Sequence, residues 1–163
     1  MNSLINNYIA QIKEIQNGQP WVGQTYEKLL KNITSDNAFI RPKASMHSVA
    51  ELLSHCTMWR EEAVLKITTG HGSKTDDAAE NWLSNQQLQA KGWATIIDRH
   101  HASIAMLLQQ LAKKEDAFLK ERYYDLDFKG HFPYEFLING MLHHDIYHLG
   151  QMALVWKYLN QLK

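Results

Sequence analysis

Cysteine, proline and glycine are all scarce in this chain of 163 residues, which has one cysteine, three prolines and eight glycines. A lone cysteine excludes a disulfide framework and a cysteine-based zinc site. The small number of helix-breaking residues favours long helices. No apolar run approaches the roughly 20 residues of a transmembrane helix, and the polar N-terminal stretch does not resemble a signal peptide. We therefore expect a cytoplasmic protein that does not enter a membrane.

An excess of charge of one sign is also lacking, because 17 basic residues balance 17 acidic residues. A neutral chain lacks the basic surface by which proteins bind nucleic acid, and the polybasic segment of a membrane-surface module. We expect neither of these partners. Hydrophobic residues make up 45% of the chain and charged residues 21%, which is typical of a globular protein. The length suits a single domain over residues 1–163.

Apolar residues recur at spacings of three and four along four long segments, which is the period of an amphipathic helix. The expected long helices cover residues 3–16, 46–69, 86–113 and 133–161, and a shorter helical stretch runs over 21–33. Ser45 is the expected N-cap of the second long helix, and Gly70 ends it. Residues 114–132 form a connection with room for a short extended piece. Few strand signals remain, so the pattern predicts an all-α four-helix bundle.

Histidine, in contrast, is abundant, with nine residues in the chain. His144 and His148 lie one turn apart in the last predicted helix, so their side chains share a face. Two imidazoles placed in this way can chelate one metal ion without a change of the backbone. On a helical wheel they lie about 80–120° from the centre of the apolar face. Gln151 shares this flank, whereas His143 points toward solvent.

Two further histidines lie on the flank of the helix predicted over residues 46–69. His55 falls about 110° from the apolar centre, and His47 lies two turns earlier on a similar side. Histidines on the flanks of two helices can meet in a cleft beside the core. Three histidine ligands leave open positions on a divalent metal, as in catalytic sites. The spacing is also compatible with unrelated, hydrogen-bonded histidines, so both interpretations stay open on these grounds.

Three residues that carry reactive groups fall on core-facing positions. Asp145 lies near the apolar centre of its helix, and a buried carboxylate must be paired or hydrogen-bonded. Its expected partner is an imidazole N–H of His55 or His100. His100 lies on the apolar stripe of the helix before it, so we expect a hydrogen-bonded core histidine or a group that supports a metal ligand. Cys56 is expected to be a small buried hydrophobic residue.

Two segments resemble the signatures of the DinB/YfiT-like superfamily. Residues 48–59 read SVAELLSHCTMW, which resembles the signature of its second helix. Residues 144–151 read HDIYHLGQ, which resembles the pattern H-[DE]-x-x-H-x-G-Q of its last helix. The resemblance implies an up-down-down-up four-helix bundle with a divalent metal, zinc or nickel above all, held by His55, His144 and His148. It also implies a homodimer.

The resemblance further implies a metal-dependent enzyme that acts on a small molecule. Characterised relatives include transferases and isomerases that use a low-molecular-weight thiol, and a metal would favour the thiolate that attacks an electrophile. One alternative is a hydrolase in which the metal activates water. Another is a dimeric stress-response protein that binds partners without catalysis. A metal with open positions beside a roomy cleft would favour an enzyme. The candidates for positioning the ligand rings are Asp145, His100, His47 and Gln151.

Overall fold

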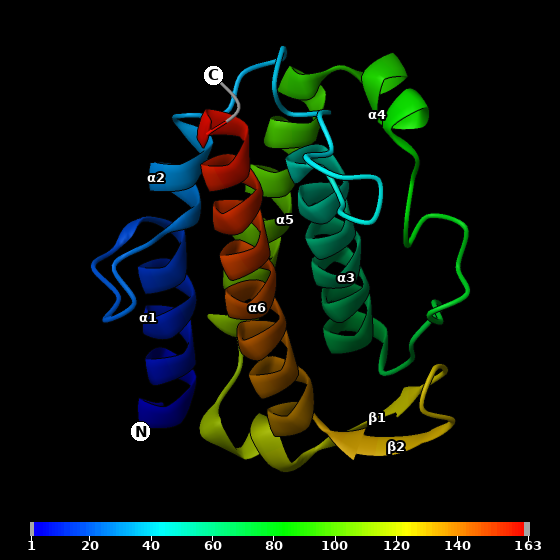
Figure 1. Ribbon diagram of the computed structural model, residues 1–163. Helices are drawn as coiled ribbons and strands as arrows, with labels where there is room; N and C mark the ends of the chain where they lie inside the picture. Colours follow the sequence, from blue (N-terminus) through cyan, green and yellow to red (C-terminus); the bar gives the residue numbers. More distant parts are fainter. Residues whose placement is uncertain (1, 162–163) are drawn as a thin grey trace.

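The computed structural model describes residues 2–161 as a bundle of four long helices with a small hairpin at one end (Figure 1). The long helices are α1 (Ser3–Asn17), α3 (Val49–Thr69), α5 (Trp93–Leu111) and α6 (Tyr134–Gln161). The shorter elements are α2 (Tyr26–Leu30), α4 (Asn85–Lys91), the 3-10 helix η1 (Asp116–Lys120), β1 (Arg122–Asp125) and β2 (Gly130–Pro133). In Figure 1, α1 and α6 run upward whereas α3 and α5 run downward, which confirms the up-down-down-up bundle. Within the described residues, no helix is long and apolar enough to cross a membrane.

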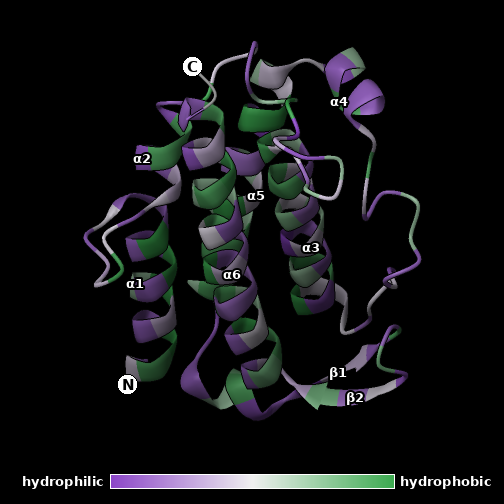
Figure 2. Cartoon of the chain, in the orientation of Figure 1, coloured by the Kyte–Doolittle hydropathy of each residue, from purple (hydrophilic) through white to green (hydrophobic). Residues whose placement is uncertain are grey.

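The apolar faces of the four long helices form one core. In α1, the buried side chains Ile5, Ile12 and Ile15 recur at spacings of seven and three, and Figure 2 shows this hydrophobic side turned toward the neighbouring helices. The most buried helix is α3, which packs against both α5 and α6. Because α3 is covered on so many sides, several of its polar side chains are also buried, and each of these needs a partner within the fold.

The start of α3 lies three residues later than the sequence pattern predicts. Ser48, not Ser45, is the N-cap, and its hydroxyl accepts a hydrogen bond from the backbone N–H of Glu51. The Glu51 carboxylate in turn accepts from the backbone N–H of Ser48 at 2.8 Å, which completes a capping box. With Ser45 as the expected N-cap, the third helical position falls on Ser48 rather than on a glutamate, so the sequence pattern does not predict this box. Gly70 ends the helix as predicted, with a φ of 79°.

Two other helix predictions need correction. The helix expected over residues 86–113 is interrupted at Gly92, whose φ of 83° and ψ of 145° lie outside helical geometry, so that α4 and α5 are separate helices. Of the stretch expected over residues 21–33, only α2 is α-helical, and Trp21 is completely exposed in a turn before it. The apolar period continued across Gly92, which is why the pattern did not indicate a break.

A small antiparallel hairpin lies at the lower end of α3, where β1 pairs with β2 (Figure 1). It is the extended piece expected within residues 114–132. Lys66 Nζ on α3 lies 2.8 Å from Asp125 Oδ2 on β1, and both side chains are buried. One turn earlier on α3, the Glu62 carboxylate accepts a hydrogen bond of 2.8 Å from the Ser73 hydroxyl. These contacts attach the hairpin and the segment after Gly70 to the side of α3 that carries His55.

Candidate metal centre

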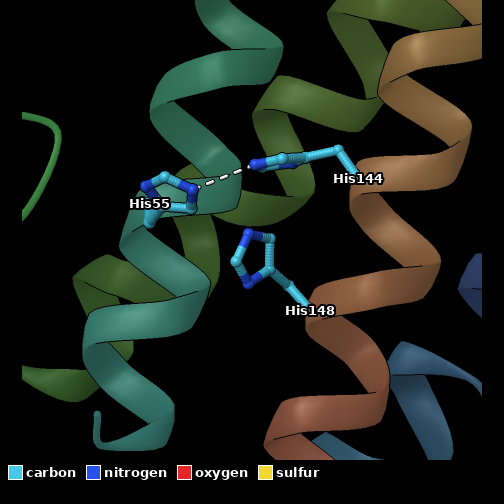
Figure 3. A group of neighbouring side chains, drawn as sticks. All are labelled: His55, His144 and His148. Carbon is cyan, nitrogen blue, oxygen red and sulfur yellow. Dashed lines mark hydrogen bonds between the residues drawn. The ribbon is translucent and has the colours of Figure 1, made fainter. Parts of the chain in front are cut away.

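Three histidines from two helices converge on one point between α3 and α6 (Figure 3). His55 comes from α3, and His144 and His148 come from successive turns of α6. One nitrogen of each ring lies within 4.8 Å of the others, and His55 Nε2 is 2.9 Å from His144 Nε2. His55 and His148 are buried and His144 is partly buried. The structure thus brings together the three residues predicted as metal ligands.

The alignment of α3 with α6 that produces this convergence is reinforced by an ion pair deeper in the bundle. Arg60, five residues after His55, donates from Nε to Asp145 Oδ2 at 2.9 Å. The backbone carbonyl of Asp145 accepts a hydrogen bond of 3.0 Å from the hydroxyl of Tyr26. Asp145 directly follows His144, so these contacts hold the turn of α6 that carries this ligand candidate.

Hydrogen bonds on the outer side of two rings define which nitrogen carries the proton. His55 Nδ1 lies 3.2 Å from the backbone carbonyl of Asn81, and His148 Nδ1 lies 2.6 Å from Gln151 Oε1. Both partners are oxygen acceptors, so each Nδ1 bears the hydrogen and each Nε2 keeps its lone pair. Metal-binding histidines are oriented in this way in proteins. Among the described residues, the buried Nδ1 of His144 has no hydrogen-bond partner.

The environment also keeps the three imidazoles neutral. Burial first, and then the neighbouring His148, lowers the pKa of His55 from 6.5 to about 4. Burial, followed by His148 and His55, lowers the pKa of His144 to about 3. Burial likewise lowers the pKa of His148, against the opposing effect of Gln151. Neutral imidazole is the form that binds a metal, so the cluster is ready for a cation at neutral pH.

These observations fit a divalent metal ion. With hydrogen on its Nδ1, His55 presents a lone pair from Nε2 toward His144 Nε2, 2.9 Å away, which donates to it when it carries the hydrogen of its ring. With that hydrogen on Nδ1 instead, His144 offers a second lone pair, and a cation between the rings binds both. Three neutral nitrogen donors suit zinc, nickel and related divalent ions. Three protein ligands also leave further coordination positions for water or substrate. The role of these residues as ligands remains a prediction.

A second group of potential donors, Cys56 and Asp145 with His144, does not form a competing site. Burial raises the pKa of the Cys56 thiol to about 12, so it stays protonated at neutral pH. Asp145 is already committed to Arg60. Cys56 is completely buried, as predicted. The Cys56 sulfur lies 3.7 Å from the hydroxyl oxygen of Tyr26.

The four residues predicted to position the ligand rings contact different partners in the structure. Gln151 contacts the ring of His148, one of the three ligand candidates. Asp145 is buried as predicted, but the expected imidazole partner is wrong, because its carboxylate binds Arg60. His100 Nδ1 lies 3.1 Å from Arg60 Nη1, so His100 belongs to the core behind this ion pair. His47 stacks on Trp82 with ring centroids 4.0 Å apart.

Sequence reasoning missed three residues that shape the site. Arg60 lies among apolar residues on the buried face of α3, and a cation in such a position indicates a buried carboxylate partner. Asn81 and Trp82 belong to the connection before α4, which reads as a polar loop. The polar residues before them give no indication that this loop folds back onto His55. The available signal is the pair of large apolar side chains, Trp82 and Leu83, in a loop that is mostly polar.

The histidine cluster forms part of the wall of an open cleft of about 580 Å³. From His55, the cleft extends along α3 past Trp59 to Lys66, a distance of about 16 Å at 1.5 Å per residue. Aromatic rings supply much of the remaining lining, among them Trp82, Phe128, Phe136 and Tyr147. A cleft of this size accommodates a small organic molecule beside the histidines.

Comparisons with known proteins agree with this architecture. The model of the DinB superfamily matches residues 21–152. A solved structure, YfiT from Bacillus subtilis, is similar over 98% of this chain and 90% of its own, with a TM-score of 0.61 and 11% sequence identity. YfiT is described as "a probable metal-dependent hydrolase with an unusual four-helix bundle topology". A comparison with curated proteins finds no match. Because the family model spans most of the sequence, this chain belongs to the DinB superfamily.

Proposed function

We propose that this protein is a divalent-metal-dependent enzyme that acts on a small molecule bound in the cleft. The observation that carries the proposal is the place of the cluster: His55, His144 and His148 converge within the wall of an open cleft of about 580 Å³. A structural metal site is closed by its protein ligands, whereas a catalytic site keeps a position open toward the substrate. Three neutral imidazoles beside an open cleft match the second arrangement.

The protein supplies the ligands and the orientation of their rings. His55, His144 and His148 hold the ion, which we propose to be zinc or nickel, and Asn81 and Gln151 fix two of the rings through Nδ1. When bound, the ion lowers the pKa of a thiol or a water molecule at its open positions. The aromatic rings of the cleft cover the apolar part of the substrate and limit the access of water.

The nucleophile comes from outside the chain under this proposal. Cys56, the one thiol of the sequence, is completely buried and burial raises its pKa to about 12, so it is neither ionised nor accessible. We favour a low-molecular-weight thiol as co-substrate, transferred to a small electrophile. Membership of the DinB superfamily supports this choice, and the cytoplasm, where such thiols are kept reduced, is the proposed location.

Water is the second candidate nucleophile. The likeness to YfiT supports it, because that protein is described as "a probable metal-dependent hydrolase". The cleft and the ligand set are the same for either reaction, so the two proposals differ only in what occupies the open metal position. Product analysis separates them, since transfer consumes one thiol for each electrophile and hydrolysis leaves the thiol unchanged.

We also propose that the protein acts as a homodimer, which the family resemblance supports. Static light scattering at micromolar concentration is the direct test. A dimer gives twice the chain mass of 18.9 kDa, and a scattering mass equal to one chain contradicts the proposal.

The experiment for the enzymatic proposal compares three proteins supplied with the same concentration of divalent metal. The wild type, His148→Ala and His143→Ala are incubated with a panel of thiols, including glutathione and bacillithiol, and a model electrophile. His143 is exposed on the same helix, so it is the matched control. Conjugation above the uncatalysed rate in the wild type and His143→Ala, but not in His148→Ala, supports thiol transfer. Equal rates in all three proteins favour a binding protein without catalysis.

A further inference from the structure

The ring of His55 is stacked against a side chain that sequence motifs do not mark. Trp82 lies over His55 with ring centroids 4.0 Å apart and planes inclined by 10°. On the other face of the indole, His47 stacks at 4.0 Å with an inclination of 12°. The three rings form a layered stack with Trp82 in the middle. An indole held on both faces has little freedom to tilt, so it is a rigid support for the imidazole of His55.

The residue before Trp82 ties the same segment to α3. The backbone carbonyl of Asn81 accepts from His55 Nδ1 at 3.2 Å, and its side-chain Oδ1 accepts from Trp59 Nε1 at 2.9 Å. Its Nδ2 donates to the backbone carbonyl of Asp76 at 2.8 Å. Asn81 is therefore bonded through backbone and side chain, and only 4% of its surface is exposed. Its contacts hold Trp82 where the stack forms.

We propose that Trp82 is a positioning residue that holds the imidazole of His55 in the orientation at which its Nε2 faces His144 and His148. The hydrogen bond that His55 Nδ1 donates to the Asn81 carbonyl determines which nitrogen is protonated, and the stack restricts the tilt of the ring plane. Neither residue needs to contact the metal. Contacts that orient ligand rings typically change metal affinity 10–100-fold when they are lost.

This inference rests on the proposed metal site, and it concerns affinity rather than turnover. Trp82 is 40% exposed, so its replacement removes a half-covered side chain and leaves the core of the bundle intact. Trp82→Leu keeps apolar bulk but loses the flat ring, whereas Trp82→Phe keeps a flat ring. Trp21→Leu is the control, because Trp21 is fully exposed and remote in the sequence from every ligand.

The test measures the dissociation constant of Zn²⁺ by competition with a chromophoric chelator, and the absorption spectrum of the Co²⁺-loaded proteins. We expect Trp82→Leu to weaken Zn²⁺ binding about 10–100-fold and to alter the Co²⁺ bands. Trp82→Phe and Trp21→Leu should bind within about threefold of the wild type, well below that range. Thermal unfolding of the metal-free proteins checks that Trp82→Leu is folded at the temperature of the titration.

The outcomes separate this inference from the proposal of a metal site. If His55→Ala loses the Zn²⁺ binding of the wild type but Trp82→Leu binds Zn²⁺ as the wild type does, the role of Trp82 is overturned and the metal site is not. Equal weakening in Trp82→Leu and Trp82→Phe also overturns it, because a flat ring would then not be what matters. A wild type that binds Zn²⁺ no better than His55→Ala overturns the metal site and the positioning role together.

Discussion

The guanidinium of Arg60 and the carboxylate of Asp145 form an ion pair of 2.9 Å in the middle of the bundle, where neither side chain reaches solvent to a significant extent. Arg60 lies on α3 and Asp145 on α6, so the pair connects the two helices that carry the histidine cluster. Arg60 Nη1 also lies 3.1 Å from His100 Nδ1 on α5. Three helices of the bundle therefore meet at one buried cation.

Asp145→Asn should destabilise the metal-free protein by about 3–5 kcal/mol, because it leaves the buried charge of Arg60 without its counter-ion. The double variant Arg60→Met/Asp145→Asn removes that charge and should recover part of the loss. Urea unfolding of the metal-free proteins measures both effects. A single variant within about 0.5 kcal/mol of the wild type, the range of ordinary surface substitutions, would show that the pair is energetically unimportant.

The neighbouring histidines of α6 provide a test of the ligand assignment. His144→Ala removes a ring that converges on His55, and His143→Ala removes an exposed ring on a different face. We expect His144→Ala to weaken metal binding by more than the roughly 100-fold limit for supporting residues, and His143→Ala to leave it unchanged. Metal content after dialysis against a weak chelator is the measurement. The reverse result would place the ligands one residue away from those assigned.

Much of this site follows from helical period alone. His144 and His148 share a face because they are one turn apart, and the same wheel places Asp145 toward the core. The partner of Asp145 does not follow, because 85 residues separate it from Arg60 and only the packing of α3 on α6 brings them together. The place of Trp82 is still less predictable, since its loop has no helical period and is positioned by the stacking of Trp82 on His55 and the hydrogen bond of Asn81 with Trp59.

His100 should make the stability of the protein depend on pH. Burial first, and then the charge of Arg60, lowers its pKa well below 6.5 in the folded protein, whereas the unfolded chain retains the ordinary value. The unfolded state therefore binds a proton first as the pH falls below 6.5. The stability that His100 contributes is present above this pH and is lost as the pH decreases toward its folded pKa.

His100→Asn keeps an acceptor for Arg60 and cannot be protonated, so it removes this contribution. Urea unfolding at several pH values between 7.5 and 5 should show a shallower loss of stability in the variant, by up to about 1.4 kcal/mol per pH unit for one proton. The other histidines titrate in both proteins, so the difference in slope reports on His100. Parallel curves for the two proteins would mean that His100 does not titrate differently on folding.

Two glycines should respond to alanine with opposite signs. Gly92 separates α4 from α5 with a φ of 83° and a ψ of 145°, a conformation that L-residues rarely adopt, so Gly92→Ala should cost about 1–3 kcal/mol. Gly150 lies within α6, and a Cβ there meets nothing within 4 Å, so Gly150→Ala should stabilise the protein by about 0.5–1 kcal/mol. Thermal unfolding compares the two variants with the wild type. Stabilisation by Gly92→Ala would indicate that α4 and α5 form one continuous helix.

Gln151 provides a test of how the imidazole of His148, a proposed metal ligand, is oriented. Its Oε1 accepts from His148 Nδ1 at 2.6 Å, on the side of the imidazole opposite to Nε2. Gln151→Met preserves the length of the side chain but removes the acceptor, so the ring loses its fixed orientation and metal affinity should fall about 10–100-fold. Gln151→Glu replaces the amide with a carboxylate, which makes the imidazole a stronger donor and should hold the metal at least as tightly as the wild type. Zn²⁺ competition titrations distinguish the variants. If Gln151→Glu weakens binding as much as Gln151→Met does, the Gln151 amide donates to His148 Nδ1, the ring carries its hydrogen on Nε2, and the proposed orientation of His148 as a ligand through Nε2 is wrong.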